Sequence, residues 1–412
     1  MQIQIRALAL VLVLLTIALA SAQSSSSIPS EYQDLYAMMD SKVSAFDARV
    51  SRSWDGQNSD VQFAAESLVA NCNRGRQLLD PLAFEGTKLE LTRLQDLGVR
   101  AVTICIGFPL LYRPFFEFNG DPDDYQRLID FYRKLSDEVH RRNLKLIVES
   151  SVLFGGVYSQ SSGLNVVEYY KKVSGQDIVA ARVDVVRTII REARPDYLNL
   201  GSEPDTQGKL TGRSDTSTPD GFSRITASLV EQLRAAGVGK TQLGAGIGTW
   251  QRSGETYLKA LCSTGIDFVD LHVYPVNRDM LDKLITYTDQ AHACGKPVAI
   301  SEAWLQKQRD AEFTQIDAVF DNAIYARDTF SFWSPLDQKF LISLVKCAHW
   351  RRLLYLSPFW SKFFWAYLDY AKVGRLSKQD LMTESARASA TGIRDGTVTP
   401  TGAAYKQAIA RR

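Results

Sequence analysis

Two glutamates stand directly after apolar runs that end in a turn. Glu203 follows such a run in "YLNLGSEPDT", and Glu302 follows one in "PVAISEAWL". A single glutamate at such a position is most often a helix-capping or ion-pair residue. Two carboxyl groups that face one bond can do more, because a protonated one supplies a proton to a departing oxygen while an ionised one stabilises or attacks the carbon. Cleavage of a glycosidic bond requires this pair.

Further polar side chains follow other apolar runs. His272 and Tyr274 occur in "DLHVYPV", and Glu149 ends "LKLIVES". Near residue 70, "VANCNRG" contains three more candidates, Asn71, Asn73 and Arg74. These three could bind sugar hydroxyls or fix Glu302, but a turn with a surface arginine explains them equally well. Glu149 is either a further sugar-binding residue or the ion-pair partner of Arg74, and we favour the ion pair.

Three tryptophans also follow predicted strands. They are Trp250, Trp304 and Trp360. An indole face at the end of a strand can stack on a sugar ring, although ordinary packing is the competing interpretation. For the remaining tryptophans of the C-terminal half, Trp333, Trp350 and Trp365, packing is the favoured interpretation.

One structural unit repeats from about residue 60 onward, and it would position these side chains. An amphipathic helix ends at Gly, Asn or Pro, and a short apolar run follows, as in "DLGVRAVTICI" and "TGIDFVDLHVY". Such runs, each separated by a helix, indicate strands buried on both faces of a parallel sheet. Counting from "ESLVAN" near residue 66 to "LLYLSPFW" near residue 353 gives eight strands. We therefore predict an α/β fold, a (β/α)8 TIM barrel with long βα loops.

The main alternative to the barrel is an open, doubly wound sheet. That fold usually has fewer strands and a glycine-rich phosphate loop, and no G-x-G-x-x-G motif opens a helix here. In a barrel, the carboxyl ends of all the strands meet at one mouth. Glu203 on strand four and Glu302 on strand seven would then face each other, with His272 and Tyr274 on strand six between them.

In this order and at these strand positions, the motifs "GSEPD", "HVYP" and "ISEAW" resemble the clan A glycoside hydrolases. The resemblance implies a retaining double displacement on β-glycosidic bonds, with Glu203 as the acid/base and Glu302 as the nucleophile. It further implies that Tyr274 orients Glu302 and that His272 lines the sugar site. The clan commonly carries Asn before the acid/base, where this chain has Ser202, which has a shorter reach toward a sugar hydroxyl.

The N-terminus predicts export. Arg6, the apolar run from Ala7 to Ala20, and the ending Ala20-Ser21-Ala22 are typical of a signal peptide cleaved after Ala22. An uncleaved anchor is the alternative, but the run is short for a membrane span. Residues 23–57 form a serine-rich link and an amphipathic helix, and residues 58–412 form the barrel. We expect a secreted or periplasmic protein without stable membrane insertion after cleavage.

Charge and cysteines limit the possible partners. Lys and Arg total 48 against 46 Asp and Glu, without a run of like charges, which argues against a nucleic-acid partner. We expect a monomer that binds a β-linked glycan and needs no cofactor or metal. Of the five cysteines, Cys262 and Cys294 end consecutive predicted helices and are the pair to test.

Two other functions remain open from the sequence alone. A barrel that binds carbohydrate without cleaving it would explain Ser202. A metal-dependent hydrolase would use Glu203, His272 and Glu302 as ligands, but one histidine is few for a first-row metal.

Overall fold

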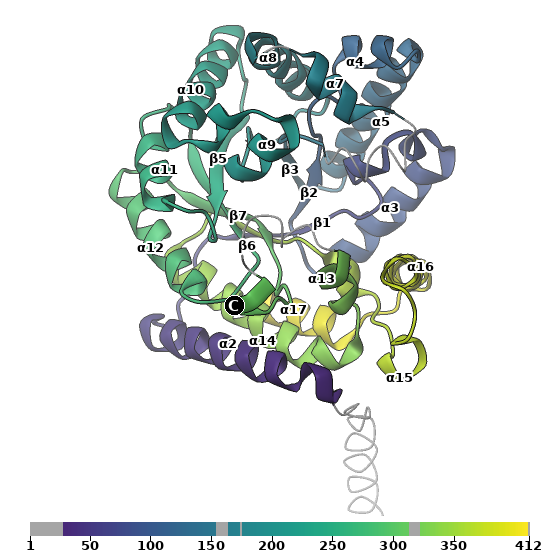
Figure 1. Ribbon diagram of the computed structural model, residues 1–412, viewed down its shortest axis with the longest axis vertical. Coiled ribbons are helices and arrows are strands. Elements are labelled where there is room, and N and C mark those ends of the chain that lie inside the picture. The colour runs from purple at the N-terminus through teal and green to yellow at the C-terminus, as the bar shows by residue number, and fades with distance from the viewer. Residues whose placement is uncertain (1–27, 154–163, 174, 313–321, 411–412) are drawn as a thin grey trace, which may run out of the picture.

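A closed barrel of eight parallel strands, in the order β1 to β8, forms the centre of the protein (Figure 1). The computed structural model describes residues 28–153, 164–173, 175–312 and 322–410. The signal peptide predicted at residues 1–22 lies outside this range. The TIM barrel is confirmed, with these strands: β1 (Gln62–Glu66), β2 (Ala101–Cys105), β3 (Lys145–Glu149), β4 (Tyr197–Asn199), β5 (Gln242–Gly248), β6 (Phe268–Val273), β7 (Val298–Ala303) and β8 (Tyr355–Pro358).

Helices form a ring around the barrel (Figure 1). Those in the βα units and at the chain ends are α2 (Gln33–Ser53), α3 (Pro81–Asp96), α5 (Pro122–Arg141), α8 (Gly175–Glu192), α10 (Pro219–Ala236), α11 (Gly254–Leu261), α12 (Met280–Ala293), α14 (Ser334–Arg351) and α17 (Pro400–Ala410). Shorter or additional helices are α4 (Arg113–Phe118), α7 (Val166–Lys172), α9 (Pro204–Thr211), α13 (Asn322–Arg327), α15 (Tyr370–Val373) and α16 (Lys378–Asp395). No helix of the described ranges is both long and apolar enough to cross a membrane.

The predicted N-terminal helix is α2, which packs along α14. Its apolar stripe is buried, as the spacing predicts: Leu35, Met39, Val43, Phe46 and Val50. Two ion pairs tie its polar edge to α14, Lys339 with Asp40 and Lys346 with Asp47. The helix therefore covers an outer face of the barrel wall.

The first strand lies earlier than the sequence predicts. We expected it in "ESLVAN", but β1 ends at Glu66. The run after Glu66 cannot continue the ladder, because the Glu90 carboxylate accepts hydrogen bonds from the backbone N–H groups of Leu68 and Val69. Glu66 is thus the last residue of the strand, at the barrel mouth.

The interior of the barrel has two layers of opposite character. The lower layer is a separate, mostly apolar cluster of Ala64, Ala101, Ile147, Tyr197, Phe268, Ala299 and Tyr355. Two residues further along each of these strands, on the same face, the buried side chain is polar: Glu66, Thr103, Glu149, Asn199, Asp270, Ser301 and Ser357. The carboxyl ends of the strands therefore present a buried polar floor to the mouth.

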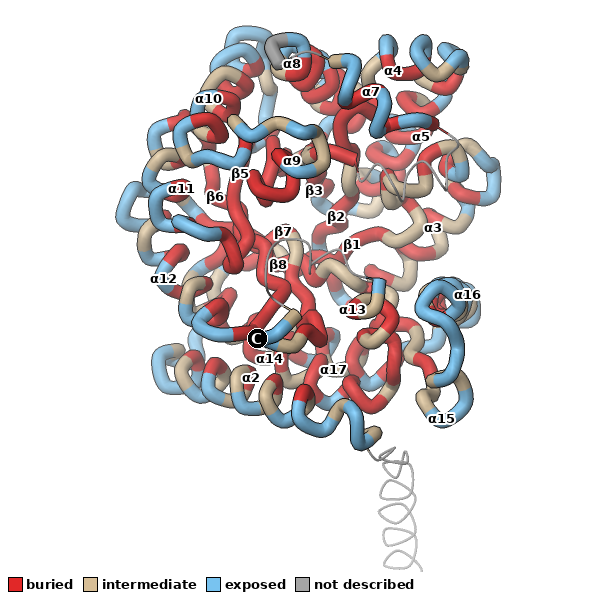
Figure 2. Tube along the Cα trace, viewed as in Figure 1, coloured by how far each residue is buried: buried red, intermediate tan, exposed pale blue. Residues whose placement is uncertain are grey.

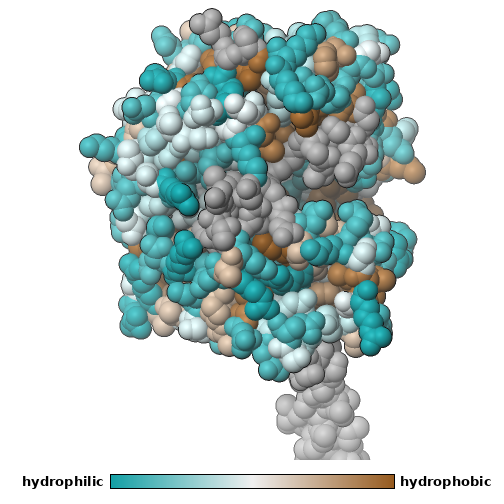
Figure 3. Space-filling model, in the orientation of Figure 1, coloured by the Kyte–Doolittle hydropathy of each residue, from teal (hydrophilic) through white to brown (hydrophobic). Residues whose placement is uncertain are grey.

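Strand β5 contributes glycines to this interior. A Cβ atom at Gly244 would lie 2.2 Å from the ring of Phe268, so only glycine leaves room for that ring. Figure 2 shows the strands at the centre as buried and the outer helices as exposed on their solvent sides. The visible surface in Figure 3 is largely hydrophilic, with scattered hydrophobic patches.

Two disulfides link neighbouring βα units. Cys262 and Cys294, the pair indicated by the sequence, are bonded with a Cα–Cα distance of 6.2 Å. The second bridge joins Cys72, which lies six residues beyond the end of β1, to Cys105, the last residue of β2. Cys347 is the free cysteine, and burial raises the pKa of its thiol to about 12.

A buried ion pair anchors the segment that follows β7. The Lys307 ammonium lies 2.5 Å from an Asp337 carboxylate oxygen on α14, and neither side chain is exposed. Asp337 also accepts a hydrogen bond from Tyr367 at 2.8 Å. Burial raises the pKa of Asp337 to about 6, although the neighbouring lysine opposes the rise.

Replacing Asp337 with alanine leaves the Lys307 charge buried without its nearest partner. We expect Asp337→Ala to lower the free energy of unfolding by about 3–5 kcal/mol, measured by denaturant unfolding. The matched control is Glu384→Ala, which breaks an exposed pair with Arg387 on α16 and should leave the unfolding midpoint nearly unchanged. Equal effects of the two substitutions would contradict a structural role for the buried pair.

Candidate active site

Glu203 lies at the turn between β4 and α9. It is the residue before the first turn of α9, and its φ of 56° places it in the left-handed region. This conformation is unfavourable for a residue with a side chain and is found preferentially at functional sites. Pro204 then starts the helix, where the missing N–H of proline costs nothing. The turn holds the Glu203 carboxyl group at the barrel mouth, where it is 9% exposed.

Glu302 reaches the mouth through a bulge in β7. The backbone register pairs Leu271 with Ile300 and His272 with Glu302, so Ser301 is an extra residue. Without the bulge, strict alternation would turn Glu302 away from the face that carries Ser301. With it, Ser301 points to Asp270 inside the barrel, and the next residue, Glu302, contacts His272.

A cavity of about 140 Å³ at the mouth collects most of the side chains singled out in the sequence. Nine of them line it together: Asn71, Glu149, Ser202, Glu203, His272, Tyr274, Glu302, Trp304 and Trp360. Asn73 lines it as well. Glu203 after β4 and Glu302 on β7 therefore line the same cavity, as expected from their predicted positions on opposite sides of the mouth.

Arg74 is the exception. Its guanidinium donates a hydrogen bond to the backbone carbonyl of Val69 and does not line the cavity. The expected ion pair between Arg74 and Glu149 is wrong, because Glu149 accepts a hydrogen bond from Asn199 at 3.0 Å and lies 3.7 Å from His272. The turn after β1 directs Arg74 toward its own loop, and among the described residues no arginine forms an ion pair with Glu149.

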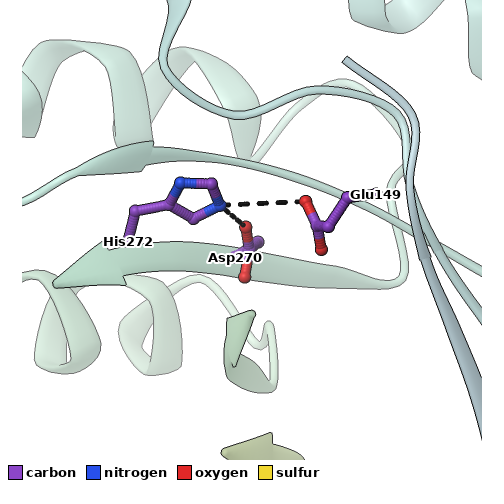
Figure 4. Close-up of side chains that lie close together, drawn as sticks. All are labelled: Glu149, Asp270 and His272. Atoms are coloured by element: carbon purple, nitrogen blue, oxygen red, sulfur yellow. Dashed lines mark ion pairs between the residues drawn. The ribbon is translucent and has the colours of Figure 1, made fainter. Parts of the chain in front are cut away.

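His272 bridges the two glutamates. Its Nδ1 lies 2.9 Å from Glu203 Oε1 and 3.3 Å from Glu302 Oε2. One ring nitrogen of His272 and one carboxylate oxygen from each glutamate all lie within 4.8 Å of one another. The opposite ring nitrogen, Nε2, lies 3.0 Å from Asp270 Oδ2 and faces Glu149 (Figure 4).

Asp270 is fully buried beneath this group and is surrounded by donors. Ser202 Oγ donates to it at 2.6 Å, and Ser301 donates through its backbone N–H at 2.9 Å and through its hydroxyl at 2.5 Å. Asn199 Nδ2 donates to the same carboxylate. These donors and His272 stabilise the ionised form of a carboxyl group that has no exposure to water.

The charges of His272 and Asp270 support each other. Burial favours a neutral imidazole, but the Glu302 and Asp270 carboxylates outweigh burial and raise the pKa of His272 well above 6.5. Burial also opposes ionisation of Asp270, yet the charge of His272 and the serine hydrogen bonds lower the pKa of Asp270 below its usual value. The pair is therefore an imidazolium and a carboxylate inside the barrel.

Burial shifts three carboxyl groups of the cavity, those of Glu302, Glu149 and Glu66, toward their neutral forms. Burial raises the pKa of Glu302 well above 4.5, and the nearby Glu203, Glu149 and Glu66 carboxylates add to the rise, while the charge of His272 opposes it. Burial and the Asp270 charge raise the pKa of Glu149 to about 7. Burial raises the pKa of Glu66 strongly, although a hydrogen bond from Asn71 opposes this. These three groups therefore ionise at a higher pH than ordinary carboxyl groups do.

The aromatic candidates differ in how much of their faces remain available. The Trp304 ring stacks on Phe363 at 5.0 Å and is 1% exposed, so packing accounts for it. Trp360 is partly exposed and lies 4.8 Å from Tyr325. Tyr274 packs its ring against His272 and Trp250. Within the described residues no hydrogen bond joins Tyr274 to Glu302, so the orienting role implied for Tyr274 has no such contact here.

Several residues of the site were missed in the sequence. Glu66 was assigned to the start of a strand and not to its end. Asp270 lies two positions before His272 in "FVDLHV". Because side chains two residues apart in a strand point to the same face, an inward-facing His272 implies an inward-facing Asp270. Tyr325 and Asp328 also line the cavity, and they come from the long segment between β7 and α14.

The three residues of the proposed metal set lie together, so their geometry alone would admit an ion. The chemistry of the donors does not favour one. A metal needs a deprotonated ring nitrogen on its histidine ligand, and the raised pKa of His272 disfavours that form. His272 is also the single histidine of this set.

No protein-family model matches the chain, and no curated protein matches it. Solved structures match over most of its length. An exo-β-1,4-mannosidase from Opitutaceae bacterium strain TAV5 superimposes with a TM-score of 0.52 at 14% identity, covering 87% of this chain and 62% of that one. The chain therefore spans less than two thirds of the mannosidase.

Two GH5_18 proteins give similar values. The one from Bifidobacterium longum subsp. longum ATCC 55813 has a TM-score of 0.53 at 15% identity, over 85% of this chain and 78% of its own. The one from Streptomyces cattleya, solved with GlcNAc, has a TM-score of 0.51 at 13% identity, over 86% and 80%. At these identities the likeness is one of fold. The barrel fold that the resemblance implies is therefore confirmed by these neighbours.

The charge state of His272 can be measured directly by NMR titration of the four histidines. We expect His272 to remain protonated at pH 7.5, whereas burial lowers the pKa of His292 and His349 and keeps them neutral there. Asp270→Asn should move the His272 midpoint downward, because a neighbouring negative charge is lost. His349 serves as the internal control, and an unmoved His272 midpoint would contradict the pairing.

The pairing of His272 with Asp270 also makes the stability of the fold depend on pH. Because the pKa of His272 is raised on folding, its contribution is fully present below the unfolded value of about 6.5. It is lost as the pH rises through the folded value.

Proposed function

We propose that the protein is a retaining glycoside hydrolase that cleaves β-glycosidic bonds in an oligo- or polysaccharide. The observation that carries the proposal is the closeness of Glu203 and Glu302, each with a carboxylate oxygen within 4.8 Å of the other and of His272. Retaining enzymes hold their two carboxyl groups about 5–5.5 Å apart, whereas inverting enzymes separate them by about 6.5–9.5 Å to admit a water. The close pair supports direct attack by one carboxylate.

The two glutamates then have distinct roles. Glu203 donates a proton to the glycosidic oxygen, and Glu302 attacks the anomeric carbon, so that the carbon–oxygen bond breaks and a covalent glycosyl ester forms on Glu302. Water next attacks the same carbon, Glu203 accepts the proton of that water, and Glu302 leaves as a carboxylate. Two inversions at one carbon give net retention.

His272 would govern where the proton of this pair lies. Its imidazolium lies close to one oxygen of each carboxyl group and favours the ionised form of both groups. In the free protein, the raised pKa of Glu302 favours the protonated form of this group. As positive charge develops on the sugar ring beside Glu302, the ionised form of Glu302 becomes favoured, and the proton is then available on Glu203 for the leaving group.

The other charges of the cavity favour a neutral sugar. Carboxyl groups line its wall: Glu66, Glu149, Glu203, Glu302 and Asp328. A uronic acid would meet like charges there, whereas the hydroxyls of a neutral sugar can donate to these oxygens. The partly exposed face of Trp360 supplies a surface on which a ring could stack. The mannosidase among the structural neighbours supports a β-linked substrate of this neutral class.

We further propose that the protein acts outside the cytoplasm after cleavage behind Ala22. The two disulfides support this, because such bridges persist in oxidising compartments.

A second candidate is a barrel that binds carbohydrate without cleaving it. The observation that favours it is Ser202, whose hydroxyl donates to Asp270 and accepts from Asn199. Ser202 is therefore occupied within the polar floor and does not replace the amide that clan members place before the acid/base.

The nucleophile can be tested with the mature protein, residues 23–412, on a panel of neutral β-glycans. We expect Glu302→Ala to abolish the release of reducing ends, and added azide to give a glycosyl azide, because the small anion fits the space of the missing carboxylate. Glu203→Gln should lower kcat by about 10²–10⁴ through loss of general acid catalysis. Glu168→Ala, on the exposed face of α7, is the matched control. A folded wild type that releases nothing from any glycan would favour the binding barrel.

The pH profile offers an independent test. Because the nucleophile must be ionised and the pKa of Glu302 is raised above 4.5, we expect the acid limb of kcat/KM to lie above pH 4.5. Glu149→Gln removes one of the carboxylates that raise this pKa, so the acid limb should move to lower pH. An acid limb that stays in place, with Glu168→Gln as the control, would show that Glu149 does not influence the nucleophile.

A further inference from the structure

A second cavity lies beside the first at the mouth of the barrel. It has a volume of about 760 Å³, within the range of about 300–1,000 Å³ usual for ligand sites. The loops after β4, β5 and β6 and the first turns of α11 and α12 line it. In Figure 1 these helices follow one another along one side of the barrel. All of the residues that line it are described, and none of them lines the catalytic cavity.

Trp250 forms the partition between the two cavities. Its ring lies 5.5 Å from the Tyr274 ring, which lines the catalytic cavity, while Trp250 itself lines the second one. A Cβ atom at Gly248 would lie 2.5 Å from the indole, so the glycine lets the ring pack against the end of β5. The second cavity is thus on the Glu203 side of the site, since Asp205 from the same turn lines it.

Four buried polar atoms in the walls of this cavity have no hydrogen-bond partner. They are Asp205 Oδ1, Trp250 Nε1, Gln251 Oε1 and Tyr257 Oη. Their residues are only 6%, 5%, 6% and 2% exposed. Trp250 Nε1 faces Asp205 without completing a well-aligned hydrogen bond. Buried groups of this kind are normally paired, so this wall is prepared for a polar ligand.

The charges of the wall match a neutral ligand. Burial, aided by the Glu203 charge, raises the pKa of Asp205 to about 6. Burial, aided by the Asp205 charge, raises the pKa of Tyr257 to about 12, so its hydroxyl keeps its proton. The wall therefore offers N–H and O–H donors next to carbonyl and carboxyl acceptors. At the rim, Lys283 is paired with Asp279 at 3.3 Å, and Glu255 lies on the same rim as Arg252.

We propose that this cavity is a second binding site for a neutral saccharide, separate from the catalytic cavity. Each sugar hydroxyl both donates and accepts, which is the pattern that the four unpaired atoms require. The proposal stands whether or not the protein hydrolyses glycans, because it involves neither Glu302 nor His272.

The test is titration calorimetry on the full chain carrying Glu302→Gln, which prevents turnover. The probes are cellotriose, mannotriose and xylotriose, with trigalacturonic acid as the acidic comparison. Thr256 is exposed and lines the cavity, so Thr256→Trp should fill it without disturbing the core. Lys259→Trp, three residues further along α11 and outside the cavity, is the matched control. Tyr257→Phe removes one hydroxyl and should weaken binding about three- to tenfold.

The expected result is a neutral trisaccharide that binds at two sites, one of which disappears in Thr256→Trp and persists in Lys259→Trp. A single site that Thr256→Trp abolishes would uphold this proposal while counting against the catalytic one. Binding that Thr256→Trp and Tyr257→Phe leave unchanged would overturn it. Binding of trigalacturonic acid alone would overturn the neutral class, and no binding of any probe would overturn the site.

Discussion

A carboxylate sealed inside the barrel is the constraint around which the site is built. Asp270 has no exposure to water, and an unpaired charge there would cost several kcal/mol. Four groups stabilise this charge: Asn199 on β4, Ser202 in the β4–α9 turn, Ser301 on β7 and His272 on the same strand as Asp270. Because His272 carries the balancing charge, the same interaction places a cation between Glu203 and Glu302. The pair of Asp270 and His272 therefore contributes both to the stability of the fold and to the chemistry of the site.

The two interior layers explain how a barrel can hold such a charge. The lower apolar layer supplies contact area with few polar side-chain atoms, the hydroxyls of Tyr197 and of Tyr355, the second of which bonds Ser301. The polar layer above it satisfies its members mutually, as in the Thr103–Ser357 hydrogen bond of 2.8 Å. A fully satisfied network of this kind specifies one arrangement, whereas a partly satisfied one is costly. The one atom left open among the members of this layer, Glu149 Oε1, belongs to a residue that lines the catalytic cavity.

Much of this arrangement could be predicted from the sequence, because helix and strand periodicity are local. The eight strands and the shared mouth of Glu203, His272 and Glu302 follow from that pattern. The polar floor does not, since Asp270 and Asn199 look like ordinary strand residues until closure of the barrel brings them together. The predicted ion pair between Arg74 and Glu149 failed for the opposite reason. The charge of Arg74 suggested a distant partner, but a local turn directs the side chain to the carbonyl of Val69. The second cavity depends on three loops whose packing no local pattern specifies.

The bulge in β7 also bears on how such a barrel changes over evolutionary time. Ser301 is one extra residue between two paired positions, and it sets which way Glu302 points. Loss of a single codon in this stretch would restore regular alternation and turn the carboxyl group out of the mouth, while the apolar layer below would keep its contacts. In this fold, the deletion of one residue separates a barrel that cleaves its ligand from a barrel that only binds it.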